Sequence, residues 1–242
     1  MSIKSKNKIR LFVNAVLEPS SRITLPEEAS HYLCNVMRLG AGEVIACFNN
    51  AAGEFDCRIE KAHKKQTEVL VLQQNRKYIP VPDIWVLFAP VKKDKTDFIV
   101  EKSVELGCRL LQPVITERTV VDKIRGERYQ AQAVEAAEQC RRVDLPEIAP
   151  AAPLAEILAH WDCGRTLFFM DETGTGISAV RAFDERKGCP AALLVGPEGG
   201  FSPSELELLR SLPYARAVSL GPRILRAETA VAAALSVWQS VA

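Results

Sequence analysis

Residues 193–205 read LLVGPEGGFSPSE, a pattern typical of a strand, a glycine turn and a helix start in an α/β fold. An apolar run, predicted to be a buried strand, ends in a turn with three glycines. A helix start follows at once, since Ser202 is a favourable N-cap and Pro203 suits the first helical position. Glu205 completes a capping box with Ser202. A glycine turn that meets a helix N-terminus leaves backbone N–H groups open to a ligand, so this loop is predicted to bind one.

A second loop of the same kind follows about twenty residues later, where residues 218–230 read VSLGPRILRAETA. A third candidate, residues 170–174, follows another apolar run. Ligands of open α/β sheets bind at the carboxyl ends of the strands. The three loops therefore predict a small-molecule site near the C-terminal end of the sequence.

From residue 83 onward, apolar runs alternate with helical patterns. This alternation predicts a parallel sheet covered by helices on both faces. The expected strands are 84–89, 110–114, 166–170, 191–195 and 217–220. The expected helices are 94–106, 127–142, 154–160, 177–183, 203–211 and 227–241.

The first part of the chain has short runs rich in β-formers, separated by turn residues. The expected strands are 10–13, 43–48, 54–60 and 67–72, with one helix at about 27–37. This pattern predicts a small β-barrel. Because residues 79–82 contain two prolines, we expect an extended joint there and two domains, 1–79 and 80–242.

Composition narrows the class of protein. The hydrophobic fraction is 48%, which favours folded domains over disorder. No apolar run approaches the roughly 20 residues that cross a bilayer, and the N-terminal residues lack the pattern of a signal peptide. The seven cysteines are odd in number and form no CxxC, and the three histidines are scattered. We therefore expect free thiols, no metal, no membrane contact and a cytoplasmic location.

The charge is unevenly distributed. Residues 1–78 carry 12 Lys or Arg against 8 Asp or Glu, a net +4, and the rest carry 19 against 22, a net −3. A basic first part is consistent with a nucleic-acid-binding module, but charge alone favours an ordinary solvated surface.

The two C-terminal loops together closely resemble those of the RsmE family, 16S rRNA (uracil-N3)-methyltransferases of the SPOUT superfamily. Three further segments carry the likeness along nearly the whole chain, namely residues 31–39, 92–107 and 135–142. One departure is Arg141, which stands where the family pattern has a small residue.

The resemblance implies a PUA-like N-terminal barrel and a SPOUT domain whose C-terminal chain forms a trefoil knot. It also implies that the chain binds S-adenosyl-L-methionine in the knot, acts as a homodimer, and methylates N3 of a specific uridine in the small ribosomal subunit. The residues expected at the cofactor are Met170, Gly196, Glu198, Gly199, Gly200, Leu220, Gly221, Ile224, Leu225 and Thr229.

Glu198 and Arg226 are the expected catalytic residues. The helix N-terminus beside Glu198 favours its ionised form, which argues against a role as general base. Arg226 begins the last helix, where the helix dipole disfavours a cation, so a substrate phosphate or carbonyl is expected to compensate. A structural ion pair with Glu228 is the alternative. The general base is unassigned.

Cations are expected to hold the RNA through its phosphates. The expected RNA-binding residues are Arg10, Arg22, His31, Arg38, Lys92, Lys95 and Arg142. Taken alone, each of them is more often a solvated charge, and His31 could equally be a satisfied, partly buried histidine.

Three other functions stay open. One is a SPOUT methyltransferase that acts on transfer RNA or on a ribose 2′-hydroxyl. Another is a non-catalytic RNA-binding protein of ribosome assembly. The least favoured is a nicotinamide-dependent oxidoreductase, since residues 174–179 (GTGISA) match the dinucleotide pattern only weakly and no suitably placed acidic residue follows.

Overall fold

The computed structural model describes residues 9–120 and 124–241, and the chain divides into two compact units. The first unit runs up to Pro80 and also includes Ala137–Leu145, a segment that the sequence analysis placed in the second domain. The second unit comprises Val81–Ala136 and the residues from Pro146 onward. Residues 77–82, around the two prolines, form no helix or strand.

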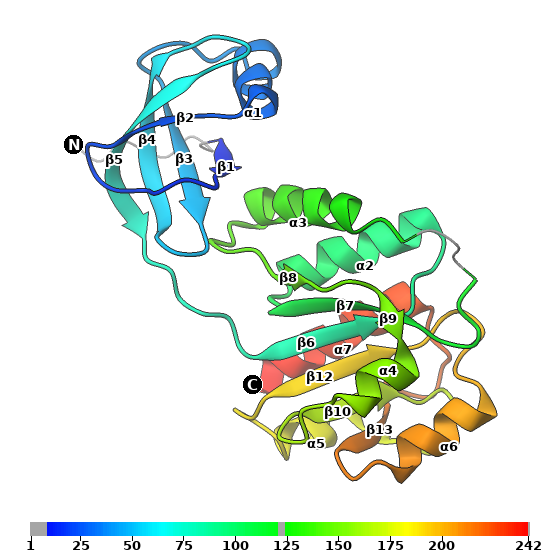
Figure 1. Ribbon diagram of the computed structural model, residues 1–242. Helices are drawn as coiled ribbons and strands as arrows, with labels where there is room; N and C mark the ends of the chain where they lie inside the picture. The colour runs from blue at the N-terminus through cyan, green and yellow to red at the C-terminus, as the bar shows by residue number, and fades with distance from the viewer. Residues whose placement is uncertain (1–8, 121–123, 242) are drawn as a thin grey trace. The chain divides into compact units, whose positions relative to one another are not determined.

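The first unit contains a curled five-stranded sheet in the order β1-β3-β4-β5-β2 (Figure 1). Its strands are β1 Arg10–Phe12, β2 Arg22–Thr24, β3 Val44–Asn49, β4 Gly53–Lys61 and β5 Glu68–Arg76. β1 pairs with β3 in parallel, and the other pairs are antiparallel. Three register shifts between β4 and β5 curl the sheet, because each irregularity bends the strand that carries it. The three-residue strand β2 was not predicted, since its single buried residue gives no alternating pattern.

One helical segment completes this unit. α1 (Glu27–His31) continues directly into a single π-helical turn, η1 (Tyr32–Val36), so the helix expected at 27–37 is confirmed. Leu33 is fully buried and joins the apolar cluster under the sheet.

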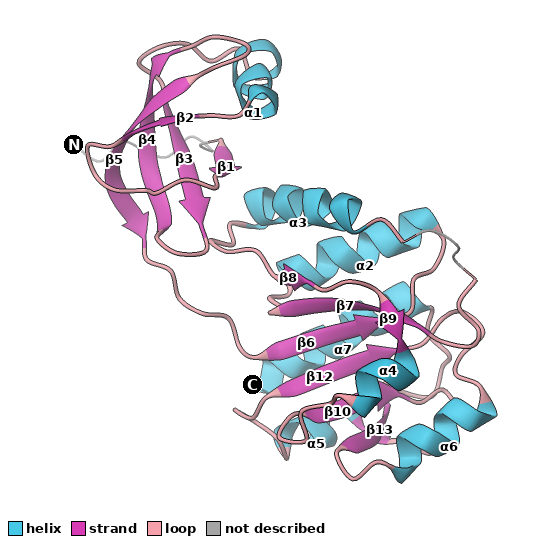
Figure 2. Ribbon diagram, viewed as in Figure 1, coloured by secondary structure: helices cyan, strands magenta, loops and turns pink. Residues whose placement is uncertain are grey.

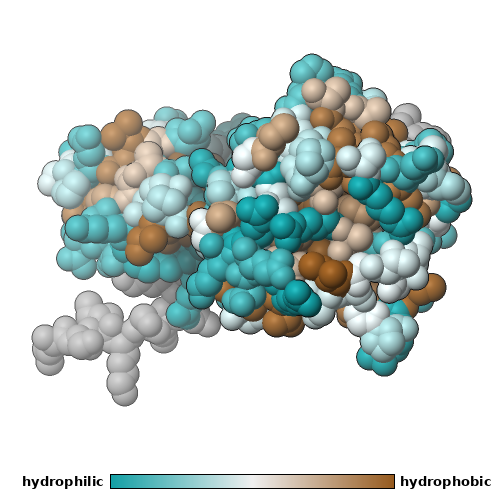
Figure 3. Space-filling model, turned by 90° about the horizontal axis from the view of Figure 1, so that it is seen from below, coloured by the Kyte–Doolittle hydropathy of each residue, from teal (hydrophilic) through white to brown (hydrophobic). Residues whose placement is uncertain are grey.

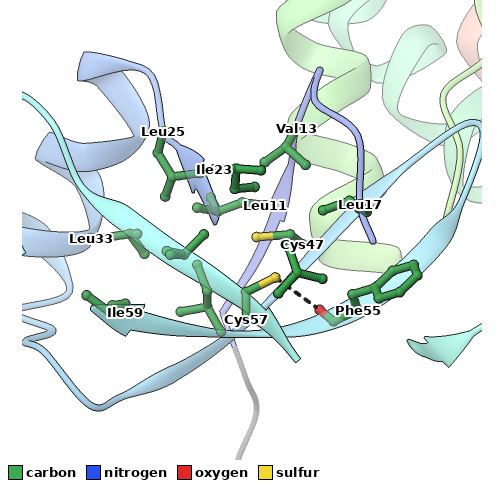
Figure 4. Close-up of a cluster of buried hydrophobic side chains, with 13 residues drawn as sticks. Leu11, Val13, Leu17, Ile23, Leu25, Leu33, Cys47, Phe55, Cys57 and Ile59 are labelled. Atoms are coloured by element: carbon green, nitrogen blue, oxygen red, sulfur yellow. Dashed lines mark hydrogen bonds between the residues drawn. The ribbon is translucent and has the colours of Figure 1, made fainter. Parts of the chain in front are cut away.

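The core of the first unit is built from alternate strand residues that point inward (Figure 4). Cys47 of β3 and Cys57 of β4 lie in it as buried free thiols. The Cys57 thiol donates to the carbonyl oxygen of Phe55 at 3.8 Å. Buried thiols of this kind act as small apolar side chains.

The second unit is a parallel sheet in the order β11-β13-β10-β12-β6-β7-β8, with β9 also paired to β7. Figure 2 shows the central strands in magenta with helices packed around them. The strands are β6 Ile84–Phe88, β7 Leu110–Ile115, β8 Glu147–Ile148, β9 Ala152–Pro153, β10 Thr166–Met170, β11 Ile177–Ser178, β12 Ala191–Val195 and β13 Ala215–Ser219. The helices are α2 Lys93–Glu105, α3 Gly126–Cys140, α4 Leu154–Ala159, α5 Ala179–Asp184, α6 Pro203–Ser211 and α7 Ala227–Val241.

Helices cover both faces of this sheet, as the alternation predicted. Leu167 and Phe169 of β10 pack in one cluster with Leu158 of α4 and Leu209 of α6. The residue between them, Phe168, points to the other face. There its ring meets Phe183 of α5 and Trp238 of α7, with centroids 4.9 and 6.2 Å away. Strands buried on both faces read as continuous apolar runs, which explains why β10 and β12 could be predicted residue for residue.

The predicted elements differ from the structure at the short strands. β8, β9 and β11 were not predicted, because two residues show no periodicity. The helix expected at 177–183 begins at Ala179, since Ile177 and Ser178 pair with β13 instead.

Hydrophilic and hydrophobic side chains are interspersed over the face drawn in Figure 3. Within the described residues, no helix has the length and apolar character needed to span a membrane.

Candidate functional site

A cavity of about 460 Å³ lies at the carboxyl ends of three adjacent strands, β10, β12 and β13. The strands run in parallel, so the loops that follow them emerge at one edge of the sheet. The structure thereby brings together the three loops that the sequence singled out. Lys95 of α2 and Ala230 of α7 complete the wall.

The glycine turn between β12 and α6 is shaped by its own backbone. The Gly200 N–H donates to the carbonyl of Pro197 at 2.9 Å, and Gly200 has φ +68°, a conformation that favours glycine. The capping box is present. The Ser202 hydroxyl accepts from the Glu205 N–H at 3.2 Å, and the Glu205 carboxylate accepts from the Ser202 N–H at 2.8 Å.

A segment that follows β7 holds this turn from outside. The Glu117 N–H donates to Glu205 at 2.9 Å, the Ser204 hydroxyl donates to Glu117 at 2.9 Å, and the Arg118 guanidinium donates to the Gly199 carbonyl at 2.7 Å. Sequence reasoning missed Glu117 and Arg118, because their partners lie more than eighty residues away and nothing local marks the pairing.

Asp171 orders the loop after β10. Its buried carboxylate accepts hydrogen bonds from the Thr173 N–H at 2.9 Å, the Thr175 hydroxyl at 2.8 Å and the Arg210 guanidinium at 2.9 Å. Burial raises the pKa of Asp171, but the hydrogen bonds from Thr173, Arg210 and Thr175 outweigh it and lower the pKa to about 2. Asp171 is therefore ionised at neutral pH.

Glu198 pairs with Lys95 across the cavity. The hydrogen bond from Lys95 lowers the pKa of Glu198, and the charges of Lys95, Lys92 and Arg226 lower it further, against a smaller effect of desolvation. A carboxylate with a lowered pKa is a weak proton acceptor.

Arg226 lies at the cavity wall immediately before α7, and its carbonyl accepts from the Ala230 N–H at 2.8 Å. Among the described residues its guanidinium has no ion-pair partner. The alternative ion pair with Glu228 is not formed, and one Glu228 carboxylate oxygen is buried without a hydrogen-bond partner in the part of the chain that the structure describes.

Most of the expected cofactor residues line the cavity, and two do not. Those in the wall are Met170, Gly196, Glu198, Gly200, Leu220, Gly221, Ile224 and Leu225. Gly199 lies outside the wall, where a Cβ would meet the Arg118 side chain at 3.6 Å. Thr229 is exposed on another face of α7, since Ala227 and Ala230, three residues apart on one helical face, line the cavity.

Two of the expected RNA-binding residues form buried ion pairs within the protein. Arg10 is buried, with only 9% of its side chain exposed. It pairs with Glu54 at 2.6 Å and donates to the carbonyls of residues 137, 138 and 142. Arg142 is buried against Asp144 at 2.7 Å. Burial argues against RNA contact by either residue, because both guanidinium groups are engaged inside the first unit.

The remaining expected RNA-binding residues are accessible to different degrees. His31, Arg38 and Lys92 are exposed, and Arg22 is exposed with an ion pair to Glu60 at 2.7 Å. Lys95 faces Glu198 in the cavity.

Comparison with known proteins identifies the family. Residues 77–239 match an RNA methyltransferase domain, and residues 25–72 match the PUA domain of RNA methyltransferases. The chain is 30% identical to the ribosomal RNA small subunit methyltransferase E of Rickettsia conorii, over 94% of this chain and 93% of the relative. This chain belongs to the ribosomal RNA small subunit methyltransferase E family. Methyltransferase E of Bacillus subtilis is also 30% identical, over 91% of this chain and 90% of the relative.

Solved structures agree with this family. Methyltransferase E of Neisseria gonorrhoeae, bound to S-adenosyl methionine, is 28% identical and has a TM-score of 0.89, covering 97% of this chain and 98% of that one. A methyltransferase of Legionella pneumophila in complex with the same cofactor is 30% identical, with a TM-score of 0.87 and coverage of 97% and 98%. The resemblance to RsmE and the parallel α/β fold with a PUA-like first domain are confirmed.

Proposed function

We propose that this chain transfers a methyl group from S-adenosyl-L-methionine to N3 of one uridine in the 16S rRNA of the small ribosomal subunit. One observation carries the proposal: a chain of the methyltransferase E family has a cavity at three strand ends, lined by the two loops that resemble RsmE. Relatives with the same fold bind S-adenosyl methionine.

The cavity fits this cofactor. A volume of about 460 Å³ is in the range of small-molecule sites. Gly221, where nothing lies within 4 Å of a built Cβ, lets a ligand approach the backbone, and Met170, Leu220, Ile224 and Leu225 offer apolar walls to an adenine ring. When bound, the cofactor supplies a methyl group activated by a sulfonium.

The residues of the chain then have to place the uracil and exclude water. Arg226 lies at the wall with its donors unpaired within the described residues, and a guanidinium matches the carbonyl oxygens that flank N3. The transfer also needs loss of the N3 proton. Asp171 and Glu198 are poor acceptors for it, since hydrogen bonds lower the pKa of both. Glu198 is better suited to hold Lys95.

We also propose the remaining features that the resemblance implies. His31, Arg38 and Lys92 contact the RNA, the protein acts as a homodimer in the cytoplasm, and its C-terminal chain forms a trefoil knot. We assign RNA binding to a PUA-like domain over about residues 1–79 and catalysis to a domain over about residues 80–242.

Nucleoside mass spectrometry tests the proposal. The purified protein, incubated with cofactor and with small subunits from cells that lack 3-methyluridine, should form 3-methyluridine. Formation of a ribose-methylated nucleoside, or methylation of transfer RNA instead, would overturn the substrate assignment. A protein that binds no cofactor in calorimetry would not be a methyltransferase at all.

Arg226→Ala tests the role of the cation at the wall. Methyl transfer should fall by about a hundredfold or more, because uracil is no longer oriented, while cofactor affinity changes little. Lys187→Ala is the matched control, since Lys187 is an exposed cation outside the cavity wall. An equal loss of cofactor affinity would move Arg226 into the cofactor site.

A further inference from the structure

A second cavity, of about 320 Å³, lies in the second unit and is lined by residues at the beginning of α2 and α3. Four cations line it, Lys92, Lys93, Arg125 and Arg128, against one carboxylate, Asp97. No part of the function described above uses Lys93, Arg125 or Arg128.

Among the described residues, only one of these four cations has an ion-pair partner. Asp97 pairs with Arg128. Within residues 9–120 and 124–241, Lys92, Lys93 and Arg125 form no ion pair. No side chain caps the N-terminus of the thirteen-residue helix α2, which adds positive potential that Asp94 in the first turn partly offsets. A cavity of this charge is suited to an anion.

An unused hydroxyl marks the same cavity. Tyr129 of α3 lines it and is only 6% exposed, with its ring tilted against Phe88 at 6.2 Å between centroids. In the part of the chain that the structure describes, the Tyr129 hydroxyl has no hydrogen-bond partner. Burial raises the pKa of this phenol, and the nearby Asp97 raises it further, so the hydroxyl keeps its proton as a donor. This oxygen is not among the buried side-chain atoms that lack a partner, so it is accessible from the cavity and free to donate to a ligand held there.

The cavity adjoins the proposed methyl-transfer site. Lys92 and Lys93 line the second cavity, and Lys95, on the same first turn of α2, lines the first and pairs with Glu198. An anion in the second cavity would thus lie close to any nucleotide held at Arg226.

We propose that this second cavity binds a backbone phosphate of the RNA substrate, through Lys93, Arg125 and the Tyr129 hydroxyl. The inference rests on the proposed function for the identity of the anion. A phosphodiester fits the observations, because its oxygens accept from both cations and from the phenol, and several cations around one anion are typical of phosphate contacts.

Lys93→Gln and Arg125→Gln, made separately in the full chain, test the site. Each should weaken binding to small ribosomal subunits by about threefold to tenfold. Each should also reduce the slope of log Kd against log salt by about one, because one phosphate contact is lost. Lys187→Gln is the charge-matched control and should change neither. Cofactor affinity should stay at the wild-type value in all three. Binding by Lys93→Gln and Arg125→Gln indistinguishable from Lys187→Gln would overturn the proposal.

Two milder variants test the same site without removing a cation. Tyr129→Phe keeps the ring against Phe88 and should weaken RNA binding by about threefold with an unchanged salt slope. Asp97→Asn should tighten binding, since it removes the one carboxylate that faces the phosphate. A merely structural role for these residues predicts no gain from Asp97→Asn, and a weaker complex there would contradict the site.

The binding and methylation experiments show which of the two proposals fails, the phosphate site or the methyltransferase activity. Wild-type protein that methylates N3, together with unaltered binding by the variants, overturns the phosphate site alone. Wild-type protein that binds no cofactor overturns the methyltransferase. The phosphate site is then still supported if Lys93→Gln and Arg125→Gln reduce the salt slope of RNA binding.

Discussion

The contribution of Asp171 to the stability of the fold depends on whether its carboxyl group is ionised. Its carboxylate has no exposed surface and holds Thr173, Thr175 and Arg210 around the loop after β10. The pKa is lowered to about 2 in the folded protein. The resulting stabilisation is fully present above the unfolded pKa, near 4, and is lost as the pH falls through about 2.

We therefore expect Asp171→Asn to lower the free energy of unfolding by about 2 kcal/mol at neutral pH. The difference from wild type should shrink steadily below about pH 4. Urea denaturation at neutral pH and at about pH 3 measures this. Asp184→Asn, at an exposed residue, is the control and should be neutral. A deficit that does not depend on pH would show that packing, and not the charge, is responsible.

Glu198 allows a prediction about the pH dependence of the reaction. Because Lys95 lowers its pKa, Glu198 is ionised throughout the neutral range and does not titrate there. Glu198→Gln should reduce activity while leaving the shape of the pH profile of kcat/KM between about pH 6 and 9 unchanged. Steady-state rates across that range decide it. Loss of a limb of the profile in the variant would identify Glu198 as the group that titrates.

At the scale of elements, the start of α6 carries the loop that lines the first cavity. Ser202 and Glu205 satisfy each other's backbone N–H groups, and Glu205 also accepts from Glu117. Glu205→Ala leaves two N–H donors without acceptors, whereas Ser202→Ala leaves one.

We expect Ser202→Ala to cost about 1 kcal/mol and Glu205→Ala about 2–4 kcal/mol of unfolding free energy. Cofactor affinity should fall in parallel, because the cap fixes the glycine turn. Denaturation and calorimetry measure the two effects. Glu207→Ala, on the same helix but exposed, is the control. If Glu205→Ala cost no more than Glu207→Ala, the capping box would not hold the loop.

The short strand β11 also depends on one residue. A Cβ on Gly176 would lie 2.7–2.9 Å from the backbone of Ala217 and Val218, so β11 can approach β13 only through glycine. Gly176→Ala should therefore shift β13 and reduce cofactor affinity by about tenfold or more, as measured by calorimetry. Gly188→Ala, at a glycine outside the cavity wall with nothing within 4 Å, should leave cofactor affinity unchanged and cost only the strain of its positive φ, about 1 kcal/mol of unfolding free energy. Equal affinities in the two variants would contradict the close approach.

At the scale of the whole molecule, the sequence predicts the elements that define the cavity. Four elements have the expected bounds, namely β10, β12, α6 and α7. Their apolar runs and helix starts can be recognised in the local sequence. The three loops could be assigned to one edge, because parallel strands place their carboxyl ends together.

Side-chain partners across the chain could not be predicted in this way. Nothing near Arg10 shows that it faces Glu54 and carbonyls about 130 residues later. Arg118, Arg210 and Lys95 likewise find partners that only the fold brings near. A cation in a sequence has the same appearance whether it is solvated, buried or bound to RNA. Arg141 adopts φ +64°, a left-handed conformation that disfavours residues with a Cβ, and nothing in the local sequence predicts it.

Arg10 provides a test at this scale, because it joins distant segments of the first unit. Its guanidinium stacks over Phe48 at 4.4 Å and bonds to Glu54 and three carbonyls. Arg10→Ala would leave those acceptors buried and unpaired. It should lower the free energy of unfolding by about 3–5 kcal/mol and speed hydrogen exchange in β1 and β4.

Arg22→Ala should leave the free energy of unfolding almost unchanged, since the pair with Glu60 is exposed and screened by solvent. The salt dependence of RNA binding distinguishes structure from contact. Under conditions where Arg10→Ala is folded, it should keep the wild-type salt slope, because a buried guanidinium releases no counterions from RNA. If Arg10→Ala instead reduced the slope of log Kd against log salt by about one and left stability unchanged, Arg10 would be an RNA-binding residue.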